Sequence, residues 1–284
     1  MLGQKLDYAI LRPFTHSRCL KTEEEMDEAA SRDADIDISR AMARLDKLMT
    51  RLDGGLPISP ELRYLDVGCG PGDMTLALAQ AGCGHVTGID MVARYVKRGR
   101  LGAQQLGLAE RVDFVCEDIH DWRPDQRYDV ILSHEALEHI SDPRSLFQQL
   151  DDLLAPGGIV VLAFGPLFHS PVGDHMDEFF RMPIPWRGAL FSEEAILRLR
   201  RERYRPTDAA TRYQDITGGL NLMRYSDFLR DVADTGWEFQ FLSVNPELKR
   251  IRPLFNLSRA LVRVPVIRDY FATSVYAILR RRAS

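Results

Sequence analysis

Apolar residues between positions 62 and 164 form short runs that alternate with amphipathic segments. The runs have the length of buried strands, and the segments between them follow the 3.6-residue period of helices. This alternation is typical of βαβ units on a parallel sheet. The predicted strands are residues 63–67, 85–90, 112–115, 128–133 and 159–164.

Further elements flank this region. From Ile38, apolar side chains recur on one helix face until Gly54-Gly55 end the pattern. Asp142 and Pro143 supply the N-cap and first-turn proline of a helix that stops at residues 156–158. A helix at 226–233 and strands at 237–244 and 273–279 follow. Together they predict an α/β fold with a doubly wound sheet.

The chain divides into four parts on this basis. Residues 1–60 form an N-terminal arm and helix, 61–165 a ligand-binding core, 166–225 an insertion cap, and 226–284 a closing helix and strand pair with a basic insert. Ser192 is the expected N-cap of a helix within the cap. Eight acids at residues 23–37 are typical of an exposed linker or of a lid that orders on binding.

Composition places the chain among ordinary globular proteins, with 284 residues, 45 % hydrophobic and 27 % charged. Its four cysteines form no CxxC pair, so neither a disulfide framework nor a structural zinc site is expected, and a reducing cytoplasm fits best. The first fourteen residues lack the apolar core of a signal peptide, and no run approaches eighteen apolar residues.

Charge is distributed unevenly. Residues 249–284 hold nine Lys or Arg against one acid, whereas the remainder holds 28 basic and 40 acidic residues. An acidic body argues against extensive contact with nucleic acid. In the basic insert 249–268, apolar residues interleave with the arginines, which favours a basic helix packed on the sheet edge. Weak peripheral contact with an anionic membrane, or a grip on an acidic substrate, is the alternative.

A glycine-rich turn follows the first strand of the core. It reads Gly68-Cys69-Gly70-Pro71-Gly72, which is GxGxG, whereas a dinucleotide fingerprint reads GxGxxG. Asp90 ends the next strand, where a carboxylate accepts both hydroxyls of a ribose. The pair predicts a nucleoside ligand and disfavours NAD.

Five motifs in order carry a more specific resemblance: LDVGCGPG, GIDMV, FVCEDI, YDVILSHEALEHISDP and LLAPGGIVVLAF. Over residues 62–165 the chain resembles the class I S-adenosylmethionine-dependent methyltransferases. The resemblance implies a Rossmann-like, seven-stranded sheet, parallel with one antiparallel closing strand, and S-adenosylmethionine as cofactor.

The resemblance also implies roles for individual residues. Asp66 and the backbone of Gly68, Gly70 and Gly72 would hold the methionine part of the cofactor, and Asp90 the ribose. Met91, Asp118 and Ile119 would surround the adenine. Ser133 and His134 would line the methyl-donor end.

Several other chemistries fail on residue identity. HExxH would need histidine at Glu138, and HxxEH would need it at Glu135, so zinc-peptidase chemistry is excluded and His139 is interpreted as a helix-end or core histidine. The segment after the fourth strand lacks the Pro-Pro-aromatic pattern of nucleic-acid amino-methyltransferases and the Pro-Cys nucleophile of cytosine C5 enzymes. A small-molecule or glycan acceptor remains.

Methylation of a hydroxyl requires a base, and histidine suits that task near neutral pH. His175 is the favoured base and His169 the second, on a loop expected over the methyl donor, with nearby carboxylates to orient one of them. The alternative is that both histidines shape the loop or bind substrate without transferring a proton. No metal is expected at Asp174, His175 and Asp177. Phe179, Phe180, Trp186 and Phe191 would stack on substrate or, more simply, form the cap's own core.

The sequence thus predicts a methyltransferase that acts at oxygen on a small molecule, a glycan or a natural-product intermediate. Methylation at carbon or nitrogen is the nearest alternative. A nicotinamide-dependent oxidoreductase and a non-catalytic cofactor-binding scaffold are the others.

Overall fold

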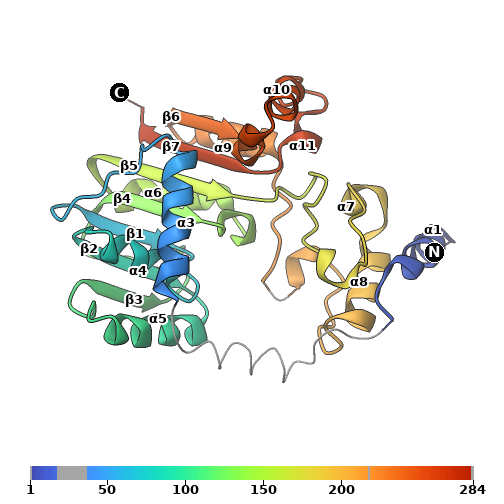
Figure 1. Cartoon of the computed structure of the whole chain (residues 1–284), viewed down its shortest axis with the longest axis horizontal. Helices are drawn as coiled ribbons and strands as arrows, with labels where there is room; N and C mark the ends of the chain where they lie inside the picture. Colours follow the sequence, from blue (N-terminus) through green and yellow to red (C-terminus); the bar gives the residue numbers. More distant parts are fainter. Residues whose placement is uncertain (1, 18–36, 217, 283–284) are drawn as a thin grey trace.

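A computed structural model describes residues 2–17, 37–216 and 218–282. It shows a seven-stranded sheet covered by helices on both faces, with a separate helical cap beyond the carboxyl ends of the parallel strands (Figure 1). The strands are β1 (Arg63–Val67), β2 (His85–Asp90), β3 (Val112–Cys116), β4 (Tyr128–His134), β5 (Leu154–Phe164), β6 (Trp237–Val244) and β7 (Val275–Arg281).

The strand order is β3-β2-β1-β4-β5-β7-β6. Strands β1 to β5 pair in parallel, and β7 pairs antiparallel with both β5 and β6. The predicted doubly wound sheet with one antiparallel closing strand is therefore confirmed. The start of β5 differs from the prediction, because Leu154 already pairs with Tyr128 and residues 156–158 lie within the strand instead of in a loop before it.

The α-helices are α1 (Leu2–Leu11), α3 (Ile38–Arg51), α4 (Asp73–Gln80), α5 (Ala93–Gln105), α6 (Pro143–Leu153), α7 (Arg187–Leu190), α8 (Glu193–Arg203), α9 (Tyr225–Asp234), α10 (Arg252–Leu261) and α11 (Arg268–Phe271). Short 3₁₀ turns are η1 (Arg12–Phe14), η2 (Leu137–His139), η3 (Asp177–Phe179), η4 (Tyr213–Asp215) and η5 (Pro246–Arg250). No helix in the described ranges is long and apolar enough to cross a bilayer.

Two predicted N-caps have different outcomes. The carboxylate of Asp142 accepts the Ser145 N–H at 3.0 Å and caps α6 as expected. Ser192 stands at the N-cap position of α8, but its hydroxyl caps nothing. Its backbone N–H instead donates to Asp7 at 2.9 Å, which ties α8 to α1.

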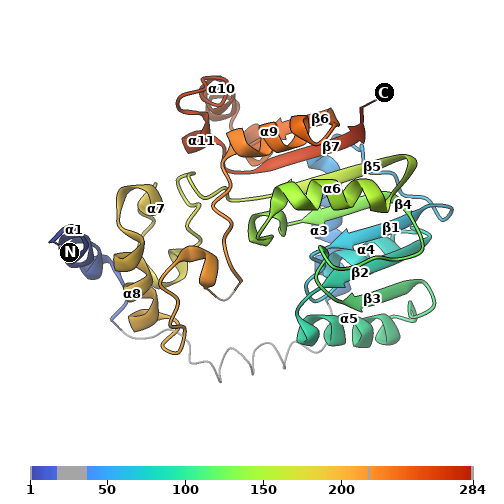
Figure 2. The ribbon, with the colours of Figure 1, turned by 180° about the vertical axis from the view of Figure 1, so that it is seen from behind.

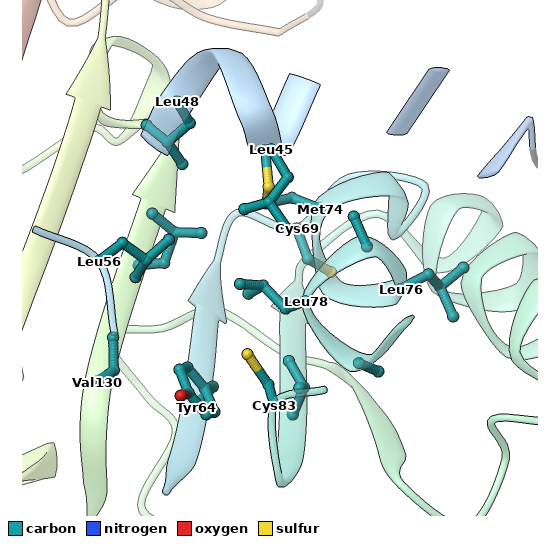
Figure 3. Close-up of a cluster of buried hydrophobic side chains, with 14 of the residues drawn as sticks. Leu45, Leu48, Leu56, Tyr64, Cys69, Met74, Leu76, Leu78, Cys83 and Val130 are labelled. Atoms are coloured by element: carbon teal, nitrogen blue, oxygen red, sulfur yellow. The ribbon is translucent and has the colours of Figure 1, made fainter. Parts of the chain in front are cut away.

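The sheet separates two hydrophobic layers. Figure 3 shows part of the first layer, in which Leu45 of α3 lies next to Met74 of α4, and Tyr64 of β1 lies beside Cys83 at the other end of the cluster. The second layer packs α6 and α9 against the opposite face (Figure 2). Burying a leucine of this kind contributes about 1.5–3 kcal/mol, so α3 is fixed to the core by its apolar face.

The N-terminal 60 residues divide between two places. Helix α1 packs on α8 of the cap, where Leu11 is fully buried, and Thr15 forms an isolated bridge with Phe180. Helix α3 packs on the sheet instead. Of the acidic stretch predicted to be a linker or lid, residues 23–36 lie outside the described residues.

Candidate functional site

The glycine-rich turn joins β1 to α4. Gly68, Gly70 and Gly72 all have positive φ, at 71°, 54° and 89°, a conformation that favours glycine. A Cβ on Gly68 would lie 2.4 Å from the Ala136 side chain, and one on Gly72 would lie 2.6 Å from the Phe114 ring. A Cβ on Gly70 would meet nothing within 4 Å. The turn therefore leaves room for a ligand at Gly70, whereas Gly72 is required by packing.

Asp90 organises the turn from the end of β2. Its Oδ2 accepts the Gly70 N–H at 2.9 Å, and its Oδ1 accepts the Val92 N–H at 2.8 Å. Each carboxylate oxygen has a second lone pair, so two further donors can still bind. Asp90 is only half-buried and can offer those lone pairs to a ligand.

Asp66 lies beneath the turn and not at its surface. Its side chain is buried and accepts the Thr75 hydroxyl at 2.6 Å, which links β1 to α4. Burial raises the pKa of the Asp66 carboxyl to about 6, against the opposing effect of the Thr75 hydrogen bond. The geometry suits a residue that holds the turn in place.

An apolar position stands open next to the turn. Met91 follows Asp90 and is 70 % exposed, although it is a large apolar side chain. Ile119 is buried, and the half-buried Asp118 accepts the His120 N–H at 2.9 Å through Oδ1. These three residues come from the segments after β2 and β3, which are neighbouring strands.

Two residues end β4 next to β1. The Ser133 hydroxyl is buried and has no hydrogen-bond partner among the described residues. The His134 ring is largely buried, and this burial lowers the pKa of the imidazole below its ordinary value. The short turn η2 follows, and its neighbour Ala136 touches Gly68.

His175 lies in the cap loop that follows β5. Its Nε2 is 2.9 Å from the carbonyl oxygen of Pro166, and because a carbonyl only accepts, Nε2 carries the hydrogen. No hydrogen bond joins Nδ1 to a described residue. Burial lowers the pKa of His175 most, with a further contribution from His139, whereas the Pro166 hydrogen bond opposes the shift.

His169 has the opposite arrangement. Its Nε2 accepts the Nε–H of Arg224 at 3.2 Å, so the lone pair on that nitrogen is occupied. Burial and the Arg224 charge lower the pKa of His169. A proton on Nε2 would break the contact with Arg224.

The carboxylates that were expected to orient a histidine have another partner. Arg187, which is 1 % exposed, donates twice to Asp174 at 2.7 Å and once to Asp177 at 3.0 Å. The expectation that these carboxylates orient one of the two histidines is therefore wrong, because His175 is bonded to the Pro166 carbonyl and His169 to Arg224. Within the described ranges, no group of three metal-binding side chains is close enough to hold an ion.

A cavity of about 160 Å³ lies where the cap meets η2. His139 and His175 line it with rings in edge-to-face contact, 5.6 Å between centroids, together with Tyr204, Arg205 and Leu220. The His139 Nδ1 is 2.7 Å from the carbonyl of Gly219, so Nδ1 is the donor and Nε2 is left as acceptor. The sequence interpretation of His139 as a helix-end residue is correct, but its place in a cavity was missed. Only the fold brings residues 139, 175 and 219 together.

The aromatic residues of the cap mostly serve its own core. Phe179 and Phe180 are buried in the cluster that also contains Leu11 and Tyr213. Trp186 packs on Phe271 outside that cluster. The simpler of the two predicted interpretations therefore holds for the buried phenylalanines.

Comparison with known proteins shows what this architecture resembles. A family model described as a methyltransferase domain matches residues 58–178. The 27-O-demethylrifamycin SV methyltransferase of Amycolatopsis mediterranei is 34 % identical over 132 residues, which are 46 % of this chain and 48 % of that protein. The ubiquinone biosynthesis O-methyltransferase of Leptothrix cholodnii is 36 % identical over 121 residues, 42 % of this chain and 48 % of that protein. The chain thus spans about half the length of these curated relatives.

Among solved structures, the fold is similar to an S-adenosylmethionine-dependent methyltransferase from Mesorhizobium loti. The TM-score is 0.52 at 16 % identity, covering 83 % of this chain and 96 % of that one. The matched family region includes β1 to β5, the glycine-rich turn and the His175 loop.

Proposed function

We propose that this chain, which belongs to the class I S-adenosylmethionine-dependent methyltransferases, transfers the methyl group of its cofactor to a hydroxyl oxygen of a small molecule. Oxygen is favoured as the acceptor atom because His175 can act as a base. Its Nε2–H donates to the Pro166 carbonyl. That contact leaves Nδ1 with a free lone pair on a residue that lines a cavity of the cap.

The residues around the glycine-rich turn fit the cofactor on their own geometry. The open space at Gly70 accommodates the close approach of a ligand to backbone, and the free lone pairs of Asp90 match two ribose hydroxyls. Met91, Ile119 and Asp118 supply two apolar surfaces and one acceptor for an adenine with an exocyclic amine. The exposed Met91 side chain would gain a covering partner.

The methionine part would lie along the backbone of Gly68 and Gly70. Asp66 would support it through the turn, since its carboxylate is buried and already bonded to Thr75. Gly72 would support it in the same indirect way, because the Phe114 ring fills the space beside it. Ser133, whose hydroxyl has no hydrogen-bond partner among the described residues, and His134 would line the methyl-donor end.

When bound, the cofactor supplies a methyl group on a positively charged sulfur. The chain must then position the acceptor oxygen in line, exclude water and accept one proton. His175 takes the acceptor's proton on Nδ1, and the resulting imidazolium keeps its Nε2–H bond to Pro166. His139 lines the same cavity and orients the acceptor through its free Nε2.

The cavity sets the scale of the acceptor. A volume near 160 Å³ is about that of a cavity that holds one benzene ring. One six-membered ring of an acceptor, either the sugar of a glycan or the ring of a natural-product intermediate, would fit in this cavity. A carbon or nitrogen acceptor would need no base, and the conformation of His175 would then serve only to shape the cavity.

Ligand binding tests the cofactor assignment first. S-adenosylhomocysteine should raise the melting temperature of the protein by mass action, whereas NADH should leave it unchanged. Asp90→Ala should lose most of that shift, because two ribose hydroxyls lose their acceptor. An equal response to NADH, or an undiminished shift in Asp90→Ala, would contradict the assignment.

Turnover tests the acceptor. The protein should transfer labelled methyl from S-adenosylmethionine to members of a panel of monocyclic phenols, catechols and simple glycosides. If only the amines or activated carbons of a matched panel are methylated, methylation at carbon or nitrogen becomes the better hypothesis.

A further inference from the structure

The segment between β6 and β7 presents an unusual surface. It contains η5, α10 and α11 and stands at the outer edge of the molecule, beside the cap (Figure 1). Of the ten residues of α10, only Ser258 is buried. Six large apolar side chains are exposed: Ile251, Leu254, Leu257, Val264, Val266 and Tyr270. The predicted packing of a basic helix on the sheet edge therefore leaves much of its apolar surface uncovered.

The exposed apolar and basic residues of α10 lie on separate stripes. At 100° per residue, the exposed Leu254 and Leu257 and the half-buried Leu261 fall on one side of the helix. Arg252 and Arg259 are seven residues apart and fall together on the side opposite the leucines. We call the six exposed apolar side chains together with Arg250, Arg252, Arg259 and Arg263 the α10 surface.

The charge of the α10 surface is positive and unneutralised. No ion pair joins these four arginines to a described residue. The two acids of the segment are directed to other partners, since Glu247 accepts the Ser274 hydroxyl at 2.6 Å and Asp269 accepts the Ser226 hydroxyl at 2.7 Å. The surface therefore combines uncovered leucines with guanidinium groups that form no ion pair with a described residue, and the Arg259 guanidinium lies over the Phe255 ring.

We propose that the α10 surface docks on an anionic lipid bilayer. An interfacial helix buries its apolar stripe at the level of the acyl chains, while the long side chains of its arginines extend back toward the lipid phosphates. A nucleic acid would satisfy the arginines but leave the leucines without a partner. A second copy of the chain has the same positive charge on this surface, and like charges oppose a symmetric contact.

The α10 surface contacts the cap through Tyr270. The indole Nε1 of Trp186 donates to the Tyr270 carbonyl at 2.8 Å, and the Tyr270 ring lies 5.9 Å from the ring of His169. Docking would thus bring the cap loop next to the lipid headgroups. The inference concerns binding alone, and it stands or fails independently of methyl transfer.

Vesicle co-sedimentation of the full chain tests the proposal. The probes are vesicles of phosphatidylcholine alone and vesicles that also contain about 30 % phosphatidylglycerol. The wild-type protein should sediment with the second kind only, and about 0.5 M NaCl should release it. Equal binding to both kinds, or to neither, overturns the proposal.

Two variant pairs identify the surface. Arg259→Gln with Arg263→Gln should weaken binding to the anionic vesicles about thirtyfold, since each basic residue near such a surface contributes about fivefold. Leu254→Asn with Leu257→Asn should weaken it at least about tenfold. Because all four side chains are exposed, the melting temperatures should stay unchanged.

The matched control removes two positive charges elsewhere. Arg94→Gln with Lys97→Gln changes exposed residues on α5, at the opposite edge of the sheet, and should bind vesicles like the wild type. If this control loses vesicle binding to the same extent, binding depends only on the net charge of the protein and the proposal is overturned. Sedimentation velocity without lipid tests for a dimer. If the wild-type protein is a dimer and the variant Leu254→Asn with Leu257→Asn is a monomer, the α10 surface is an interface between copies and the proposal is overturned.

Discussion

His175 and His169 differ in which ring nitrogen retains a free lone pair. In His175 the Pro166 carbonyl takes the Nε2–H and leaves Nδ1 available, whereas in His169 the Arg224 guanidinium occupies Nε2. A neutral His169 must therefore carry its hydrogen on Nδ1. Only His175 can accept a proton without losing a contact, which separates two residues that the sequence ranked only as first and second.

His175→Asn should lower turnover by about 10² to 10⁴, the usual contribution of a positioned base, while S-adenosylhomocysteine affinity stays nearly constant. Asn suits the test because His175 has a φ of 55°, a conformation that Asn tolerates better than most residues. Since burial lowers the pKa of His175, the wild-type rate should fall on the acid side with a midpoint below about 6.5. That limb should vanish in His175→Asn.

His169→Ala is the control for that experiment. It removes the acceptor for Arg224 but no free base, so turnover should change only a few-fold and the acid limb should persist. If His169→Ala abolishes the limb and His175→Asn does not, the assignment of the base is wrong.

At this scale the sequence predicts what depends on local pattern. Gly70 and Asp90 are recognisable because the strand, the turn and the next strand are contiguous in the chain, and the structure joins them by one hydrogen bond. Arg187 and the cavity position of His139 are not recognisable, because their partners are defined by packing of the cap on the sheet. The wrong expectation that a carboxylate orients one of the two histidines has the same origin, since sequence proximity does not reveal that Arg187 binds Asp174 and Asp177.

The turn between β1 and α4 contains glycines that are required for different reasons. Both Gly70→Ala and Gly72→Ala place a side chain at positive φ, which costs about 1–2 kcal/mol. Only Gly72→Ala also drives a Cβ into the Phe114 ring. We therefore expect Gly70→Ala to lower the free energy of unfolding by about 1–2 kcal/mol and Gly72→Ala by more than about 3 kcal/mol.

For cofactor binding, we expect Gly70 to act directly and Gly72 only through the packing of the turn. Gly70→Val should abolish the thermal shift given by S-adenosylhomocysteine while circular dichroism stays that of the wild type, because the larger side chain enters open space. Urea denaturation gives the stability of each variant. Equal destabilisation by both alanines would mean that the packing argument for Gly72 is wrong.

The turn η2 joins the core to the cap through Glu138. Its carboxylate Oε1 accepts the Gly165 N–H at 3.1 Å, its Oε2 has no partner among the described residues, and its carbonyl accepts the Asn221 N–H at 2.9 Å. Burial raises the pKa of Glu138 to about 7, against opposing contributions from backbone hydrogen bonds and His139. The protonated form is therefore favoured in the fold.

This raised pKa has a defined consequence for stability. The protonated Glu138 carboxyl contributes fully to the free energy of unfolding below its unfolded pKa of about 4.5. This contribution, about 3 kcal/mol in total, is lost as pH rises from there through the folded pKa of about 7. Glu138→Gln should remove this part of the pH dependence while keeping an acceptor for Gly165. Denaturant titrations between about pH 5 and 8 measure it. Parallel pH profiles in the two proteins would show that the carboxyl titrates outside this range.

Most elements are local enough to be predicted, and the exceptions depend on distant partners. The strands of the core lie within a residue or two of their predicted bounds, except that β5 begins at Leu154 because β4 offers a pairing position there. The Ser192 hydroxyl caps nothing, and Asp7, more than 180 residues earlier, instead takes the backbone N–H at that position. A pattern of apolar residues contains no information about such a partner.

The whole molecule contains a third hydrophobic cluster that is separate from the two layers of the sheet. Leu11 of α1 lies in it with Phe179, Ile196 and Tyr213, although α1 and these residues are more than 160 positions apart in the chain. The tyrosine hydroxyl of Tyr8 donates to Glu202 at 2.7 Å. The N-terminal helix is thus part of the cap, which supports the cavity that contains His175.

Leu11→Ala should therefore loosen the cap and spare the core. Removing a fully buried leucine costs about 2–5 kcal/mol, and here the loss falls on the cluster of α1, η3 and α8. Hydrogen exchange should become faster across residues 176–220, while β1 to β5 keep their protection and S-adenosylhomocysteine binds as before. Leu48→Ala is the matched control, because Leu48 is equally buried but belongs to α3 on the sheet, and it should speed exchange in α3, α4 and β1 instead. If both variants accelerate exchange throughout the chain, cap and core unfold as one unit, and the cap has no separate hydrophobic core of its own.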